Sequence, residues 1–317
     1  MIDFKRDIYT AYERSRPYIR HTPLEHSPYL SRIVDGDVYL KLDNIQKTGS
    51  FKFRGAVSKM TSLSDQEKSN GVVTASTGNH GAACSLAMSL LGLKGKIVVP
   101  EIVHKNKVKN IINFGGEVEY FGDDCIRAEE RAQEISRDTG ATYISPYNDP
   151  HIVCGQGTMG YEIHKDLPEA DAVFISVGGG GLITGVGGYL KGMNRNTQMN
   201  GVSPANSCVM YESIKAGKQL DLPSEDTLSD GTAGGVELGS ITFELCQEII
   251  DDFILVSEDE IAEGIRIGVE KHHQLIEGAA GTAIAGFLKK KDQLRGQTVV
   301  IVMCGGNISP EVLKSVL

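Results

Sequence analysis

Features of membrane, secreted and metal-binding proteins are missing from this sequence. No apolar run approaches the roughly 20 residues that a helix needs to cross a bilayer, and residues 1–6 lack the pattern of a signal peptide. The six cysteines include no Cys-x-x-Cys pair, and His272 and His273 are adjacent rather than spaced as helical metal ligands. We therefore expect a cytoplasmic protein with reduced thiols, no membrane partner and no metal site.

Positive charge is scarce as well. The chain has 32 Lys and Arg residues against 41 Asp and Glu residues, which gives a formal net charge of −9 at pH 7. This acidity disfavours nucleic acid as a partner and still leaves room for a locally positive pocket. With 317 residues, of which 40% are hydrophobic, the chain can bury a full core and is expected to form two lobes.

What the sequence does contain is a lysine in an apolar, glycine-flanked frame. Lys52 lies between Phe51 and Phe53, and Arg54 comes next in the chain. Apolar surroundings or a neighbouring cation lower the pKa of an amine and make it an imine-forming nucleophile. The alternative is a surface lysine at the start of an amphipathic helix.

A run of four glycines follows a strand-like segment, residues 172–176. The run and the residue after it are Gly178, Gly179, Gly180, Gly181 and Leu182. Glycine permits unusual dihedrals and a close approach of a ligand, and amide N–H groups at a strand-to-helix turn bind phosphate. No Gly-Lys-Ser/Thr follows, and the acid of a dinucleotide site is missing. The alternative is a flexible tight turn.

A polar loop stands before a predicted helix. Its residues are Ser76, Thr77, Gly78, Asn79 and His80. Hydroxyl and amide groups, together with backbone N–H groups at a helix start, can hold a substrate carboxylate. The alternative is a simple N-cap, for which serine, threonine and asparagine are all favoured.

Strand-like and helical segments alternate along the chain. We expect strands at 72–75, 96–100, 117–121, 172–177 and 298–303, and helices at 82–91, 105–114, 125–139 and 259–278. This alternation predicts an α/β fold in which parallel strands are joined by crossover helices.

Five motifs, in order, resemble those of the fold-type II pyridoxal-phosphate enzymes, and within them the serine/threonine dehydratase and serine racemase group. The motifs span nearly the whole chain: Ser50-Phe51-Lys52, the 76–80 loop, Gly155-Gln156-Gly157-Thr158, the glycine run and Cys304-Gly305-Gly306-Asn307. The resemblance implies two lobes, each with a mainly parallel twisted sheet flanked by helices, and pyridoxal 5'-phosphate in the cleft. It also implies a homodimer, a large cofactor-binding domain (1–67 and 150–317) and a small inserted substrate-binding domain (68–149).

The same resemblance implies a role for each motif. Lys52, next to Phe51, would carry the cofactor through an imine and then act as a general base at the substrate α-carbon. The glycine run and Leu182 would bind the cofactor phosphate, and Asn79 would bind the ring hydroxyl. Cys304 would face the pyridine nitrogen as a neutral partner, which favours expulsion of a β-hydroxyl. The 76–80 loop would hold the substrate carboxylate.

We therefore expect a pyridoxal-phosphate-dependent ammonia-lyase that removes water from a small β-hydroxy amino acid and gives a 2-oxo acid and ammonia. Racemases of the group carry a serine as the acid opposite the lysine, and the extra methyl of Thr77 weakens that activity. Residues 203–209 contain no carboxylate, unlike the cation-dependent members. This stretch and residues 230–235 are closer to the dehydratases of hydroxyectoine utilisation. A hydroxyectoine-pathway dehydratase, a serine racemase and a non-catalytic binding module stay open as alternatives.

Overall fold

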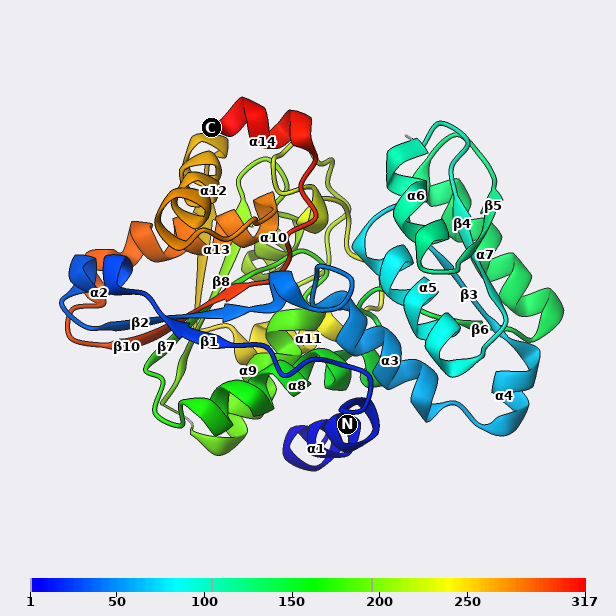
Figure 1. Cartoon of the computed structure of the whole chain (residues 1–317), viewed down its shortest axis with the longest axis horizontal. Helices are drawn as coiled ribbons and strands as arrows, with labels where there is room; N and C mark the ends of the chain where they lie inside the picture. The colour runs from blue at the N-terminus through cyan, green and yellow to red at the C-terminus, as the bar shows by residue number, and fades with distance from the viewer. Residues whose placement is uncertain (1, 104, 195) are drawn as a thin grey trace.

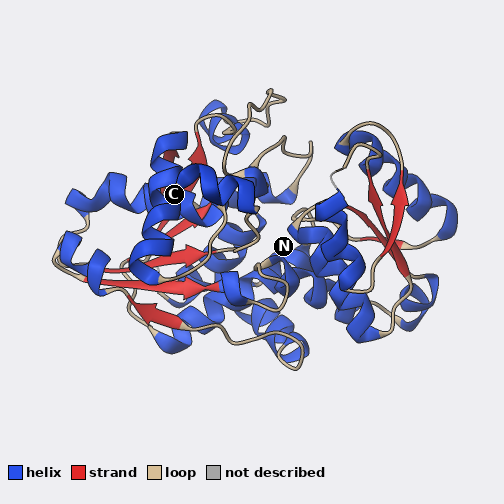
Figure 2. Ribbon diagram, turned by 45° about the horizontal axis from the view of Figure 1, so that its top comes forward, coloured by secondary structure: helices blue, strands red, loops and turns tan. Residues whose placement is uncertain are grey.

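The computed structural model describes residues 2–103, 105–194 and 196–317 of the chain. These residues form two lobes, each built on its own sheet (Figure 1). Helices surround the strands in both lobes, as Figure 2 shows. The predicted α/β fold with two sheet-containing lobes is therefore confirmed.

The large lobe contains a six-stranded sheet. Its order is β1-β2-β10-β7-β8-β9, and only the β1–β2 pair is antiparallel. The strands are β1 (Leu24–His26), β2 (Asp37–Leu42), β7 (Ala172–Ser176), β8 (Gln198–Pro204), β9 (Asp252–Val256) and β10 (Thr298–Met303). Strands from both ends of the chain thus lie side by side, with β10 between β2 and β7.

The small lobe contains a four-stranded parallel sheet in the order β5-β4-β3-β6. The strands are β3 (Val72–Ala75), β4 (Gly95–Val99), β5 (Glu117–Tyr120) and β6 (Thr142–Tyr143). The expected domain boundaries at residues 68 and 149 stay a prediction. Phe53 and Val57, which precede residue 68, already pack in one apolar cluster with Val72 and Ile97 of the small sheet.

Helices connect and cover the strands. They are α1 (Phe4–Ser15), α2 (Pro28–Val34), α3 (Lys52–Ser62), α4 (Asp65–Asn70), α5 (Asn79–Leu91), α6 (Lys105–Asn113), α7 (Cys125–Thr139), α8 (Pro150–Asp166), α9 (Gly181–Met193), α10 (Val209–Ala216), α11 (Ile241–Ile249), α12 (Glu258–His272), α13 (Gly278–Lys290) and α14 (Pro310–Val316), with short turns η1 (Asp43–Ile45), η2 (Asp230–Thr232) and η3 (Lys291–Gln293). Of the helices in the described ranges, none is long and apolar enough to cross a bilayer.

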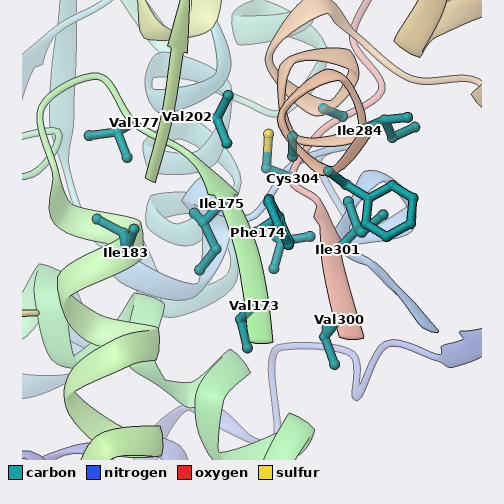
Figure 3. Close-up of a cluster of buried hydrophobic side chains, with 14 of the residues drawn as sticks. Val173, Phe174, Ile175, Val177, Ile183, Val202, Ile284, Val300, Ile301 and Cys304 are labelled. Atoms are coloured by element: carbon teal, nitrogen blue, oxygen red, sulfur yellow. The ribbon is translucent and has the colours of Figure 1, made fainter. Parts of the chain in front are cut away.

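The central strands of the large sheet are buried on both faces. Figure 3 shows this core, in which side chains of β7 and β10 pack with residues of α9 and α13. The ring of Phe174 meets that of Phe287 edge to face, at 5.9 Å between centroids. Nearly continuous apolar runs are typical of parallel strands covered on both sides. This packing fixes the strand ends that carry the site.

The predicted elements are present in the structure, but several strand and helix ends differ by one to three residues, and one predicted helix is divided in two. Segments 72–75, 125–139 and 298–303 match β3, α7 and β10. The helix expected at 82–91 begins earlier, at Asn79. The helix expected at 259–278 is two helices, because α12 ends where His273 takes a left-handed conformation with φ 55° and α13 begins only at Gly278.

Candidate active site

A cavity of about 350 Å³ brings the predicted site residues together. All thirteen border it: Phe51, Lys52, Ser76, Thr77, Gly78, Asn79, His80, Gly178, Gly179, Gly180, Gly181, Leu182 and Cys304. Strand direction explains this convergence. The glycine run and Cys304 follow two adjacent parallel strands, β7 and β10, so they emerge at the same edge of the sheet, where α/β folds bind ligands. Residues of both lobes line the cavity.

Lys52 is the first residue of α3 and points its amine into this cavity. The chain before it is fixed to the segment after β10, because the Phe51 N–H donates to the Cys304 carbonyl at 2.9 Å. The amine donates to the carbonyl of Pro146 at 3.0 Å and lies 5.2 Å from the centre of the Phe51 ring. Desolvation lowers the pKa of this amine from 10.5 to about 8. A substantial neutral fraction is therefore available near physiological pH.

Cys304 follows β10 and is buried. Its sulfur lies 3.5 Å from the Ser176 hydroxyl at the end of β7. Burial raises the pKa of this thiol, so it is neutral at physiological pH. Cys304 therefore presents a weak, uncharged polar group to the cavity.

The glycine run forms the turn between β7 and the first residue of α9. Gly180 has φ 84°, a left-handed conformation that favours glycine. At Gly179 a β-carbon would lie 2.4 Å from the ring of Tyr147, so the ring and the bare backbone are in close contact. N–H groups at the start of α9 and the positive helix end favour an anion here.

The 76–80 loop joins β3 to α5 of the small lobe. The Ser76 hydroxyl accepts a hydrogen bond from the Gly78 N–H at 3.2 Å, and Asn79 begins α5. His80 is buried, and its ring lies 3.0 Å from the Ile144 carbonyl. Desolvation lowers the pKa of His80 to about 3, with a further contribution from the Lys52 charge. This histidine is therefore neutral.

Glu277 is a buried acid that the sequence analysis missed. It borders the cavity and accepts hydrogen bonds from Asn79 Nδ2, at 2.9 and 3.0 Å, and from the Asn307 N–H at 3.1 Å. Desolvation raises the pKa of this carboxyl to about 7. The only signal in the sequence is an acid next to Ile276, immediately before the small and apolar residues of α13.

A cluster of four buried charged side chains includes Arg54, two residues after Lys52. The Arg54 cluster consists of Lys41, Asp43, Arg54 and Glu162, all with side chains that are 0% exposed. Arg54 donates to both Asp43 oxygens, at 2.7 and 2.8 Å, and to both Glu162 oxygens, at 2.7 and 2.8 Å. Lys41 adds an ion pair to Glu162 at 2.7 Å. Two cations and two anions therefore balance within the protein interior.

These geometries agree with comparisons against known proteins. A family model of pyridoxal-phosphate dependent enzymes matches residues 15–305, and the chain belongs to this family. It is 39% identical to an L-threonine ammonia-lyase of Thermotoga maritima over 98% of this chain and 77% of that protein. It is 38% identical to a catabolic L-threonine dehydratase of Escherichia coli, over 95% of this chain and 92% of that protein.

Solved structures show the same fold. Maize serine racemase superposes with a TM-score of 0.92 at 30% identity, covering 98% of this chain and 95% of that one. A processed threonine deaminase of Solanum lycopersicum superposes with a TM-score of 0.93 at 35% identity, covering 99% and 86%. The predicted family, its fold and its cofactor are thereby confirmed. The site also fits pyridoxal phosphate chemically, since a poised lysine and a glycine turn at a helix start border one cavity.

Proposed function

We propose that this enzyme is an ammonia-lyase that removes water from threonine, serine or a similar small β-hydroxy amino acid, giving a 2-oxo acid and ammonia. The observation that carries the proposal is the Lys52 amine, whose pKa is about 8 and which shares its cavity with the glycine run. Threonine dehydratases that match most of the chain support this reaction.

The large lobe would hold the cofactor. N–H groups of the glycine run and of Leu182, at the start of α9, would bind the phosphate. The Lys52 amine would bond to the aldehyde carbon, next to Phe51, and Cys304 would face the ring nitrogen. When bound, pyridoxal phosphate supplies an electron sink for the charge left at the substrate α-carbon. The Lys52 amine would also serve as the general base that takes the α-proton of the substrate.

The small lobe would hold the substrate carboxylate. Ser76 and Thr77 offer hydroxyl groups, and Gly78, Asn79 and His80 offer N–H groups at the start of α5. Because His80 is neutral and its ring is engaged by the Ile144 carbonyl, its contribution would come from the backbone. The Thr77 hydroxyl is the candidate acid opposite Lys52.

Racemisation of an amino acid is the second candidate. Structural similarity to serine racemases of maize and of Dictyostelium discoideum, at 30% and 33% identity, favours it. A dehydratase of the hydroxyectoine pathway stays a further alternative for the substrate.

A substrate panel tests these alternatives. The holoenzyme would be incubated with L-threonine, L-serine, 3-hydroxyaspartate and hydroxyectoine-derived amino acids, and 2-oxo acid, ammonia and the enantiomers of the remaining amino acid would be measured. We expect equimolar 2-oxo acid and ammonia from threonine or serine, with little D-enantiomer. D-serine accumulating faster than pyruvate would make the protein a racemase instead.

The phosphate position has its own test. Gly179→Asp places a side chain against the Tyr147 ring and a negative charge in the turn, so we expect cofactor affinity to fall by about a hundredfold or more. Gly192→Asp, near the C-terminal end of α9, the helix that follows this turn, is the control. Equal cofactor affinity for both variants and the wild type would place the phosphate elsewhere.

We further propose that the protein works as a homodimer in the cytoplasm, as the family resemblance implies. Light scattering of the holoenzyme should give twice the chain mass of 34.2 kDa. A monomeric mass at micromolar concentration would contradict the dimer.

A further inference from the structure

The side-chain amide of Asn79 is held from both ends. Its Nδ2 lies 2.9 and 3.0 Å from the two carboxylate oxygens of Glu277, and its Oδ1 accepts from Asn307 Nδ2 at 2.7 Å. Asn307 Nδ2 also donates to the Thr48 carbonyl at 2.8 Å. A backbone carbonyl can only accept, so the Thr48 carbonyl makes Asn307 Nδ2 the donor, and the Asn79 atom that faces it is the acceptor Oδ1. Both amides therefore have a single orientation that satisfies every partner.

Two glycines make room for these partners. A β-carbon at Gly305 would lie 2.4 Å from Glu277 Oε1, and one at Gly49 would lie 2.6 Å from Asn307 Oδ1. Gly49 also has φ 73°. These glycines belong to the segments around Lys52 and Cys304, and the Gly306 N–H donates to the Gly49 carbonyl at 2.9 Å. Both segments are therefore shaped around the side chains that hold Asn79.

The hydrogen bonds of the Asn79 side chain leave one of its two N–H groups without a protein partner in the arrangement described. Its Nδ2 carries two hydrogens, and its Oδ1 faces Asn307. Both Glu277 oxygens are bonded to the same nitrogen, and one shared hydrogen satisfies them. One N–H therefore stays available on a residue that borders the cavity.

We propose that Glu277 and Asn307 are positioning residues that keep an N–H of Asn79, rather than its carbonyl oxygen, directed at the ring hydroxyl of the cofactor. The proposal rests on the proposed function, which assigns Asn79 to that hydroxyl. A flipped amide would present an acceptor to an oxygen that carries negative charge, so the hydrogen bond would become a repulsion. Neither positioning residue needs to touch the reacting atoms.

The experiment titrates apoenzyme with pyridoxal phosphate and follows the dissociation constant and the absorbance band of the bound cofactor. Glu277→Gln keeps the shape beside Gly305 but can turn its own N–H₂ toward Asn79. Asn307→Asp offers only acceptors to Thr48 and Asn79. Since a hydrogen bond to a charged group is lost, each should weaken binding by about ten- to a hundredfold and shift the band.

Controls separate positioning from general damage. Glu119→Gln removes a carboxylate that binds Lys96 and Arg131 in the small lobe, and it should leave the dissociation constant unchanged. In an Asn79→Ala background, Glu277→Gln should add almost nothing, because the residue it positions is gone. A merely structural glutamate would weaken binding equally in both backgrounds.

The outcomes distinguish the two proposals. An Asn79→Ala variant with wild-type affinity and spectrum would refute the assignment of Asn79 to the ring hydroxyl. A strong effect of Asn79→Ala, with none from Glu277→Gln and Asn307→Asp, would overturn the positioning role alone. If Asn307→Asp fails to fold, the double-mutant cycle of Glu277→Gln and Asn79→Ala still tests the positioning role, because glutamine has nearly the same shape as glutamate.

Discussion

Lys52 and Arg54 lie two residues apart on α3, yet their surroundings are opposite. Arg54 is fully buried and its guanidinium contacts Asp43 and Glu162 through both oxygens of each. Lys52 borders the cavity, and its hydrogen-bond partner in the described chain is the carbonyl of Pro146. Two residues of helix turn the chain through about half a circle. The cation on one face of α3 is therefore paired with carboxylates, whereas the cation on the other face donates to an uncharged carbonyl.

This difference separates a cation paired with carboxylates from one whose pKa is lowered by desolvation. The planar fork of arginine suits bidentate carboxylates, and arginine stays charged at all relevant pH values. A lysine in desolvated surroundings, without a carboxylate bonded to it, gives up its proton more easily. The carbonyl of Pro146 and the neutral thiol of Cys304 do not compensate its charge. The contacts of Arg54 anchor the first turn of α3, and the pKa of the nearby Lys52 amine stays lowered.

Replacement of Lys52 should have the largest effect. Lys52→Ala should abolish turnover and the absorbance of lysine-bound cofactor, because no other lysine borders the described cavity. Activity assays and absorbance spectra of the purified variant measure both. Lys59→Ala, on the same helix but paired with Asp149, should keep the absorbance. Wild-type turnover in Lys52→Ala would show that Lys52 is not the reactive lysine, and the contrast drawn with Arg54 would then not bear on catalysis.

Replacement of Arg54 should instead affect stability. Arg54→Met leaves Asp43 and Glu162 buried with Lys41 as the one remaining cation of the cluster, and breaking such a buried pair costs about 3–5 kcal/mol. Lys52→Met removes a desolvated charge, so we expect a change within about 1 kcal/mol. Urea unfolding of both apoproteins provides the comparison. Equal losses of stability would mean that the two faces of α3 do not differ as described.

Much of this site could be predicted because its motifs are local. Lys52, the glycine run and the 76–80 loop each combine a strand or helix end with residue types that favour one chemistry. Parallel strands then bring such ends together, as β10 beside β7 does for Cys304 and Ser176. The match between expectation and cavity lining follows from this rule.

The residues that sequence reasoning missed depend on register between distant segments. Glu277 reaches Asn79, 198 positions away in the chain, and no local pattern marks that contact. Tyr147 covers Gly179 because the chain between β6 and α8 passes over the glycine run. The helix break after His272 was also missed, since its left-handed residue is not a glycine. Long-range packing decides the positions of Glu277 and Tyr147.

The third expected effect concerns pH. With a pKa of about 8, the Lys52 amine of the apoenzyme should react with acetic anhydride at half its maximal rate near pH 8. Below that value the rate should fall about tenfold per pH unit, because the protonated form does not react. Peptide mass spectrometry measures the labelling, and the denatured chain is the control, with a midpoint near the ordinary value of 10.5. A midpoint near 10.5 in the folded apoenzyme would show that the pKa of Lys52 is not lowered, which would contradict the difference described between Lys52 and Arg54.

The smallest effect is expected from removal of divalent cations. The family resemblance implies that cation-dependent members carry carboxylates in the segment that corresponds to residues 203–209. In this chain the segment offers neutral side chains that already form hydrogen bonds. Ser203 donates to the Val177 carbonyl at 2.7 Å, Asn206 donates to the Asp226 carbonyl at 2.8 Å, and Ser207 lies 2.9 Å from the Ser224 hydroxyl.

Mg²⁺ and Ca²⁺ take about six to eight oxygen ligands, with carboxylates supplying most of the negative charge. The described residues include no group of three or more His, Cys, Asp or Glu side chains placed to hold a metal. Activity after exhaustive dialysis against EDTA, assayed at fixed ionic strength, should therefore equal that of the untreated enzyme. A loss that Mg²⁺ or Mn²⁺ restores and K⁺ does not would show that backbone carbonyls and water build a divalent site here, and would place this enzyme with the cation-dependent racemases.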